Sequence, residues 1–166
     1  MDIVDWIRDR CPGAIDELRD RIEISHATGE RSTIWFGEDS VPNLLVGGGF
    51  YSRYDGMDLL SSTFKVASSR RRERAGVPLV FDFAELLAEV RDLDVEFPAG
   101  SRPFMYQSGI GYYAVNNDGR IHEWDSEIRV VTATYGSIIE VLEEWFAAVY
   151  SHRQGPTSIV QPRSED

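Results

Sequence analysis

The sequence predicts one α+β domain, in which a bent and mostly antiparallel β-sheet is flanked by helices. The chain has 166 residues and 42% hydrophobic content, which suits a single domain with one core. Helical spacing of apolar residues dominates the first part of the chain, and short β-rich segments dominate after residue 102. We expect the domain to span residues 1–150, and residues 151–166, which are rich in polar residues, Gly and Pro, to form a disordered tail.

Two helices are expected near the start of the chain. The first covers residues 3–10 and places four apolar side chains on one face, namely Ile3, Val4, Trp6 and Ile7. A second helix is expected to begin at Pro12, because the N–H that proline lacks has no helical partner at that position anyway. Its apolar face would hold Ile15, Leu18 and Ile22. Residues 25–31 then fit a polar loop, and residues 33–36 a short strand.

The next segment combines a helix signal with a helix breaker. "GEDSVPNLL" is typical of a turn that leads into a helix, with Ser40 as the cap and Pro42 in the first turn. The triple glycine at residues 47–49 interrupts this helix, because each interior Gly costs about 1 kcal/mol relative to Ala. The helix therefore either ends there or restarts near Phe50 and ends at residues 55–56.

The remaining elements are mainly strands, expected at residues 57–60, 64–67, 77–81, 104–107, 112–115, 120–125 and 130–133. The basic run at residues 68–76, which contains Arg70, Arg71, Arg72 and Arg74, is expected to be an exposed loop. Residues 82–93 form the clearest amphipathic pattern, and residues 137–149 predict a closing helix. Asn117, Asp118 and Gly119 favour the tight turn of a hairpin.

Charge and cysteine content limit the classes of partner. Seventeen Lys and Arg against 28 Asp and Glu give a net charge of −11, which repels phosphate backbones and attracts basic proteins. Direct binding of nucleic acid is therefore not expected. Cys11 is the single cysteine, which prevents an internal disulfide and fits the cytoplasm. No run approaches the roughly 18 apolar residues of a membrane span, and no signal peptide is recognised, so no membrane association is expected.

No catalytic or metal-binding motif stands out. His26, His122 and His152 lack the spacing of metal ligands. Ser62 and Lys65 match the Ser-x-x-Lys spacing of serine acyl-enzymes, but they lie among β-forming residues and no Lys-Thr-Gly motif accompanies them. The triple glycine is not followed by the Gly-Lys-Ser/Thr of a phosphate loop. The sequence therefore predicts a protein without enzymatic activity, metal or cofactor.

The richest cluster of polar and aromatic residues is "GIGYYAVNNDGRIHEWDSE", residues 109–127. In a strand, alternation puts Glu123 and Asp125 on one face and His122 with Trp124 on the other. We expect this hairpin to be the surface that contacts a partner. The expected acidic contact residues are Asp118, Glu123, Asp125 and Glu127, and the expected aromatic anchor is Tyr112 or Tyr113.

Two blocks of the chain resemble the SUKH superfamily, which includes fungal cell-wall-synthesis regulators and many bacterial immunity proteins. The blocks are "SVPNLLVGGGFYSRYDGMDL" and "GYYAVNNDGRIHEWDSE" together with "YGSIIEVLEEWFAAV". They carry packing and turn residues and no catalytic group. The resemblance implies a bent sheet flanked by helices that serves as a binding scaffold, and for bacterial members an antidote that neutralises a toxin, often a nuclease.

Three functions follow from these observations. The first is an immunity-like protein that neutralises a cognate basic toxin domain by direct binding. The second is a regulatory or scaffolding domain that binds a cellular partner without any toxin. The third is a small hydrolase with an acid pair near Glu123 and Asp125, which requires a concave pocket that raises the pKa of one carboxyl group. The oligomeric state is left open by the sequence.

Overall fold

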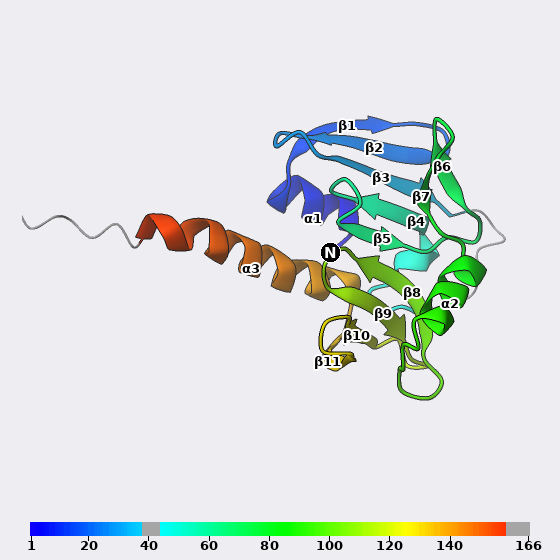
Figure 1. Ribbon diagram of the computed structural model, residues 1–166. Helices are drawn as coiled ribbons and strands as arrows, with labels where there is room; N and C mark the ends of the chain where they lie inside the picture. The colour runs from blue at the N-terminus through cyan, green and yellow to red at the C-terminus, as the bar shows by residue number, and fades with distance from the viewer. Residues whose placement is uncertain (38–43, 159–166) are drawn as a thin grey trace, which may run out of the picture.

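The computed structural model in Figure 1 describes the backbone of residues 1–37 and 44–158, and the side chains of that part as far as residue 149. This part of the chain forms a single α+β fold with a large antiparallel sheet, as the sequence predicts, and it contains three α-helices, fewer than expected. The predicted cap Ser40 and Pro42 lie outside the described residues. Residues 44–49 are not helical.

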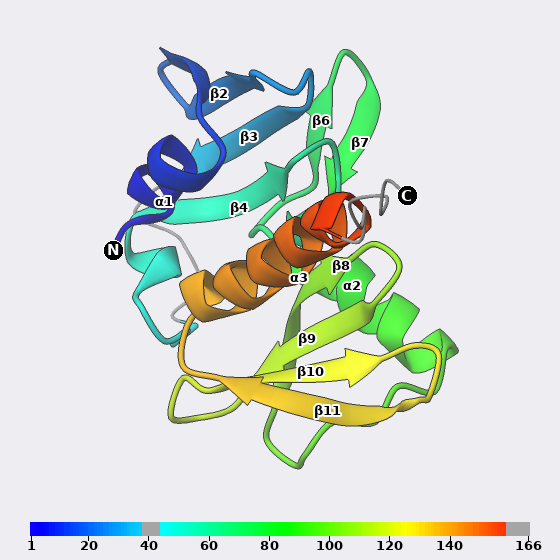
Figure 2. The ribbon, with the colours of Figure 1, turned by 90° about the vertical axis from the view of Figure 1, so that its left-hand side faces the viewer.

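The sheet has nine strands, and every neighbouring pair is antiparallel. Their spatial order is β1 (Gly13–Glu17), β2 (Arg21–His26), β3 (Arg31–Phe36), β4 (Tyr54–Leu59), β5 (Phe64–Val66), β8 (Arg102–Gln107), β9 (Gly111–Val115), β10 (Ile121–Asp125) and β11 (Val130–Tyr135). Register shifts interrupt three of the pairings, β3–β4, β8–β9 and β10–β11, and such bulges bend and twist a sheet. Figure 2 shows the strong twist that results.

Both faces of the sheet are covered. Helices α1 (Ile3–Arg10) and α3 (Ile138–Ser158) pack on one face, over the larger hydrophobic cluster. Helix α2 (Phe83–Asp92) covers part of the other face over a smaller cluster, next to the hairpin of β6 (Arg72–Arg74) and β7 (Val77–Val80). Because both faces are covered, β4 and β9 are buried along their whole length instead of alternating.

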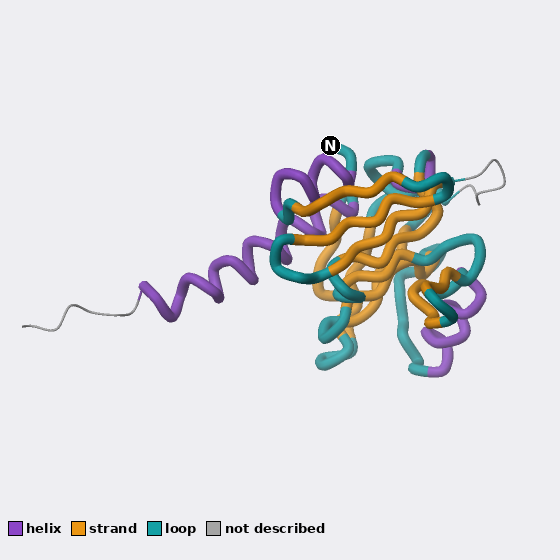
Figure 3. The backbone as a smooth tube through the Cα atoms, turned by 90° about the horizontal axis from the view of Figure 1, so that it is seen from above, coloured by secondary structure: helices purple, strands orange, loops and turns teal. Residues whose placement is uncertain are grey.

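Helix α3 packs against the N-terminal helix α1 and against strand β5. The Trp6 indole N–H donates a hydrogen bond of 2.8 Å to Glu143, and the ring of Phe64 meets that of Trp145 edge to face. The helix continues to Ser158, so residues 151–158, expected in the tail, are helical here. Figures 1 and 3 show this end of α3 extending away from the sheet. Residues 159–166 lie outside the described residues.

The prediction of a second helix from Pro12 is wrong, because residues 13–26 form the β1–β2 hairpin. The spacing of Ile15, Leu18 and Ile22 satisfies a helix, but Ile22, Ile24 and His26 are buried alternately, with the period of a strand. Three β-branched isoleucines in this segment also favour a strand. The apolar residues of this segment fit both the helical and the strand period, and pairing with β3 selects the strand.

The prediction of an exposed loop at residues 68–76 is also wrong in part. Arg72 is buried, and its guanidinium lies 2.9 Å from the Asp55 carboxylate of β4 and 5.6 Å from the centre of the Trp35 ring. Ser68 and Ser69 complete the arrangement, because Ser68 Oγ accepts from Arg72 and the Ser69 N–H donates to Asp55. The ion pair therefore fastens the β6–β7 hairpin to the main sheet.

The triple glycine is explained by close packing of backbones. The Gly47 N–H donates to the Gly119 carbonyl at 2.8 Å, and a Cβ on Gly47 would lie 1.7 Å from the carbonyl oxygen of Gly136. Gly48 and Gly49 have φ angles of +88° and +73°, which lie in the left-handed region. The helix expected to restart at Phe50 is one 3₁₀ turn, Phe50–Ser52. The loop at residues 47–49 therefore packs against both the β9–β10 turn and the segment just before α3.

Gly47→Ala is expected to lower the free energy of unfolding by about 3 kcal/mol, because the backbone must move apart to admit a methyl group. The matched control is Gly29→Ala, where nothing lies within 4 Å of the added Cβ and only the φ of +92° opposes the change. This control should cost about 1–2 kcal/mol. Urea unfolding of the two variants measures both effects. Equal losses at the two positions would contradict the close approach at Gly47.

Asp58 is expected to make stability depend on pH. Burial raises the pKa of this carboxyl group, and the hydrogen bonds from Ser62 and the charges of Lys65 and Arg74 oppose the rise only in part. The stability linked to a raised pKa is complete below the ordinary Asp value of about 3.9 and is lost as pH rises through the raised value. Asp58→Asn should therefore flatten the fall in unfolding free energy above about pH 4.

Urea unfolding at a series of pH values tests the role of Asp58. Asp118→Asn serves as the control, because Asp118 is exposed and has no hydrogen bond in the described part of the chain. A wild-type pH dependence in Asp58→Asn would show that Asp58 does not titrate as its burial requires.

Candidate functional site

The β9–β10–β11 segment contains all six residues expected to contact a partner, but the structure separates them. Asp118 lies exposed in the β9–β10 turn, at one end of β10. Asp125 and Glu127 lie at the other end, where β10 turns into β11. Asp125 closes that turn by accepting hydrogen bonds from the N–H groups of Glu127 at 2.8 Å and Ile128 at 3.2 Å. The acids therefore do not form one cluster.

Glu123 and Tyr113 are brought together beneath α3. The Glu123 carboxylate accepts hydrogen bonds from Tyr113 at 2.9 Å, Tyr135 at 3.1 Å and Thr132 at 2.9 Å. Burial raises the pKa of the Tyr113 hydroxyl far above its ordinary value, and the Glu123 charge raises it further. Glu123, Tyr113 and Tyr135 line a cavity of about 180 Å³, whose wall on α3 includes Glu144. Glu123, on β10, thus accepts hydrogen bonds from both neighbouring strands, β9 and β11.

Tyr112 lies on the opposite face of the sheet, where it packs with Trp124, Leu86 and Val90 beneath α2. The alternation expected for β10 is confirmed, because Ile121 belongs to the cluster beneath α3 and Trp124 to the cluster beneath α2. Tyr112 and Tyr113 are 5% and 1% exposed, so neither ring lies on the surface as an aromatic anchor.

The acid pair that a hydrolase would need is not assembled from the expected residues. Glu123 lines the cavity beneath α3, whereas the Asp125 carboxylate is held by the backbone of the β10–β11 turn. The two side chains therefore do not share a pocket. Among the described residues, no group of three or more His, Cys, Asp and Glu side chains is arranged to hold a metal ion.

The surface that stands out at this end of the sheet is apolar with an acidic rim. Ile128, Val130 and Val131 are 61%, 51% and 36% exposed, and they follow Asp125 and Glu127 directly. We call these five residues the hairpin surface. Val130 and Val131 point to opposite faces of the edge strand, and Ile128 lies in the turn before it. Exposed apolar side chains bordered by polar groups are typical of protein contact sites.

Arg129, the basic residue of this turn, is directed away from the carboxylates of Asp125 and Glu127. Its guanidinium donates to the Leu93 carbonyl at 2.9 Å and lies 5.4 Å from the centre of the Trp124 ring. The side chain therefore reaches back toward α2. The hairpin surface keeps an acidic border beside its apolar centre.

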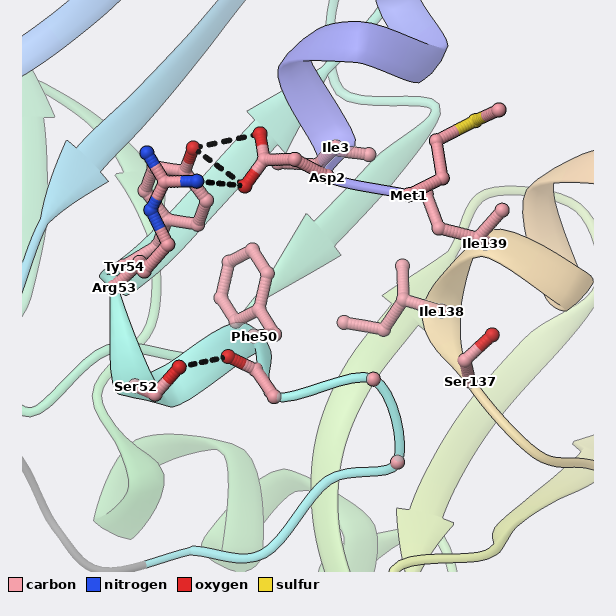
Figure 4. Close-up of a pocket in the computed structure, with 13 residues that line it drawn as sticks. Met1, Asp2, Ile3, Phe50, Ser52, Arg53, Tyr54, Ser137, Ile138 and Ile139 are labelled. Atoms are coloured by element: carbon pink, nitrogen blue, oxygen red, sulfur yellow. Dashed lines mark hydrogen bonds and ion pairs between the residues drawn. The ribbon is translucent and has the colours of Figure 1, made fainter.

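A second hollow lies at the start of α3, and Figure 4 shows it in close-up. It measures about 270 Å³ and lies between the N-terminal segment, the loop at residues 47–49 and the start of α3. Asp2 accepts from Arg53 at 2.8 Å, from Tyr54 at 2.8 Å and from the Val4 N–H at 2.9 Å. Burial, and then the hydrogen bond to Asp2, raise the pKa of Tyr54 above its ordinary range. These polar groups are partners of one another, which favours a structural role.

No helix in the described part of the chain is long and apolar enough to cross a membrane. Comparison of the chain with protein-family models, with curated proteins and with solved structures found no match.

Proposed function

We propose that this protein is a protein-binding domain of the SUKH type, an immunity-like protein that neutralises a basic toxin domain by direct contact in the cytoplasm. The observation that carries the proposal is the hairpin surface, where three exposed apolar side chains adjoin Asp125 and Glu127. Such a surface offers a partner an apolar centre to bury and a charged border to recognise.

Charge supports a basic partner. The chain carries a net charge of −11, and a toxin that acts on nucleic acid needs a positive surface to hold phosphates. Opposite charge speeds the encounter of two such proteins and disfavours acidic competitors. The acidic rim then orients the partner, while Ile128, Val130 and Val131 supply the area that is buried.

The resemblance to the SUKH superfamily supports the same function at the level of architecture. It implies a bent sheet flanked by helices, and the chain has a twisted antiparallel sheet with helices on both faces. In the first block that carries the resemblance, the loop at residues 47–49 contacts the β9–β10 turn of the second block through Gly47 and Gly119. The two blocks thus form one structural unit.

Co-expression tests the proposal. The product of the gene next to the one that encodes this chain should arrest growth when expressed alone, and this chain should restore growth and co-purify with that product. Failure of both rescue and complex formation would contradict the proposal. A growth defect on deletion in cells without any toxin would instead favour the regulatory or scaffolding function.

A further inference from the structure

The sheet ends in two strands, β1 and β11, and no other strand of the described chain pairs with their outer sides. Figure 1 shows them at opposite ends of the sheet, β1 at the top and β11 at the bottom. The outer side of an edge strand presents unpaired N–H and C=O groups, which can pair with a strand of another molecule. Natural proteins commonly protect such edges with charge, proline or short strand length.

The β1 edge carries this protection. Pro12 precedes the strand, and Asp16 and Glu17 are exposed within it. A strand approaching this edge would have to desolvate two carboxylates beside a residue without an N–H group. β1 is therefore a poor template for pairing.

The β11 edge lacks charge and proline. Its sequence, VVTATY, is rich in the β-branched residues that favour strands, and Val130, Val131, Thr132 and Thr134 are exposed. Its one irregularity is the bulge at Thr132, whose hydroxyl donates to Glu123 at 2.9 Å and is thereby tied into the sheet. With no charge or proline in the strand and no further strand of the described chain beside it, the edge is available to a pairing strand, and Asp125 and Glu127 border one end of it.

We propose that the outer edge of β11 binds an extended segment of the partner by strand addition, with Arg or Lys residues of that segment meeting Asp125 and Glu127. This inference rests on the proposed function and deepens it, because it gives the form and the chemistry of the bound segment. The added strand pairs its backbone with β11 and packs alternate side chains beside Val130 on one face and Val131 on the other.

Charge favours a basic segment over a second copy of the chain. In a two-fold pairing of β11 with itself, two proteins that each carry a net charge of −11 would meet, and the nearby basic residue of each, Arg129, is directed toward Leu93 and Trp124. A segment with Arg or Lys at one end instead places its charge against Asp125 and Glu127. The bound strand thereby acquires a fixed end and a fixed register.

The probe is a capped synthetic peptide, Arg-Lys-Val-Thr-Val-Thr-Val, added to the full chain, with hydrogen exchange and amide chemical shifts as readouts. Strand addition predicts at least tenfold slower exchange for outward amides of Val130–Tyr135, and chemical-shift changes that are largest along β11. The same peptide N-methylated at every internal residue keeps its charge and side chains but lacks the backbone donors. It should give no protection.

Matched protein variants separate the edge from the charge. Val131→Lys places a charge on the edge and should abolish the protection by the peptide. Asp118→Asn changes the net charge equally at the far end of β10 and should leave the protection intact. Protection that survives Val131→Lys would overturn strand addition.

The other outcomes are equally decisive. Shift changes confined to Asp125 and Glu127, without slower exchange on β11, would overturn strand addition and leave the proposed function standing. Protection of β11 in the protein alone, together with a dimer in sedimentation, would make a second copy the occupant and overturn the basic segment. Absence of peptide binding while the neighbouring gene product still forms a complex elsewhere would do the same.

Discussion

Replacing Asp55 by Asn is expected to lower the free energy of unfolding by about 3–5 kcal/mol, which is a large part of the stability of a domain of this size. Asp55 and Arg72 are 4% and 6% exposed at their side chains, and their charged atoms lie 2.9 Å apart. Removal of the carboxylate charge takes from the buried Arg72 guanidinium the negative charge that lies 2.9 Å away. That desolvation penalty is much larger than the worth of an exposed ion pair.

Urea unfolding measures this loss, with Asp5→Asn as the matched control. Asp5 forms an ion pair with Arg8 in which both side chains are 62% exposed, so the same substitution there should cost less than about 1 kcal/mol. Adding Arg72→Met to Asp55→Asn should recover part of the stability, because the buried charge is then removed as well. Equal effects at Asp55 and Asp5 would show that the β6–β7 hairpin is not held by this pair.

The double variant Asp125→Asn, Glu127→Gln is expected to slow association with the basic partner by about tenfold at low salt, because complementary charge acts mainly on the rate of encounter. The fold should remain unchanged. Asn at position 125 keeps the oxygen that accepts from the N–H groups of Glu127 and Ile128, and Glu127 is exposed. Stopped-flow or surface-based kinetics at several salt concentrations measure the effect.

The control for the charge variant is Asp118→Asn, which removes an exposed acid at the opposite end of β10. Association should slow much less in this control, and the difference between the two variants should disappear at high salt as the charges are screened. Asp118→Asn removes one charge and the double variant removes two, so a slowing in the control half as large on a logarithmic scale would mean that net charge alone attracts the partner. The hairpin surface would then have no directing role.

Much of the fold could be predicted because local signals and burial agree. The bounds of α1, residues 3–10, follow from the helical spacing of Ile3 and Val4 with Trp6 and Ile7. The side chains of Trp6 and Ile7 are fully buried. The turn at residues 117–119 follows from Asn-Asp-Gly, whose glycine has a φ of +84°. Alternation along β10 correctly placed Ile121 and Trp124 on opposite faces.

The parts that could not be predicted depend on contacts between distant residues. Arg72 belongs to an arginine run that is typical of an exposed loop, and only its pairing with Asp55, seventeen positions earlier, buries it. Residues 13–26 satisfy both helical and strand periods, and the neighbouring strand β3 decides the outcome. Glycine is required at position 47 because the backbones of Gly119 and Gly136 lie too close for a Cβ atom, and the local sequence does not reveal this contact.

The candidate surface was predicted in part. The sequence directed attention to the hairpin and to Asp125 and Glu127, but it missed Ile128, Val130 and Val131. Burial alternates along a strand that has one face on the core, and the edge strand β11, with two adjacent exposed valines, departs from that rule. Two adjacent valines directly after an acidic turn are the one signal in the sequence that could have shown this surface.

Binding through the hairpin surface is tested by growth rescue and co-purification with the double variant Ile128→Asp, Val130→Asp. Both side chains are more than half exposed, so the variant should fold with the thermal stability of the wild type. The variant should no longer bind the basic partner and should no longer restore growth. A folded variant that still binds and protects as well as the wild type would show that the hairpin surface does not bind the partner.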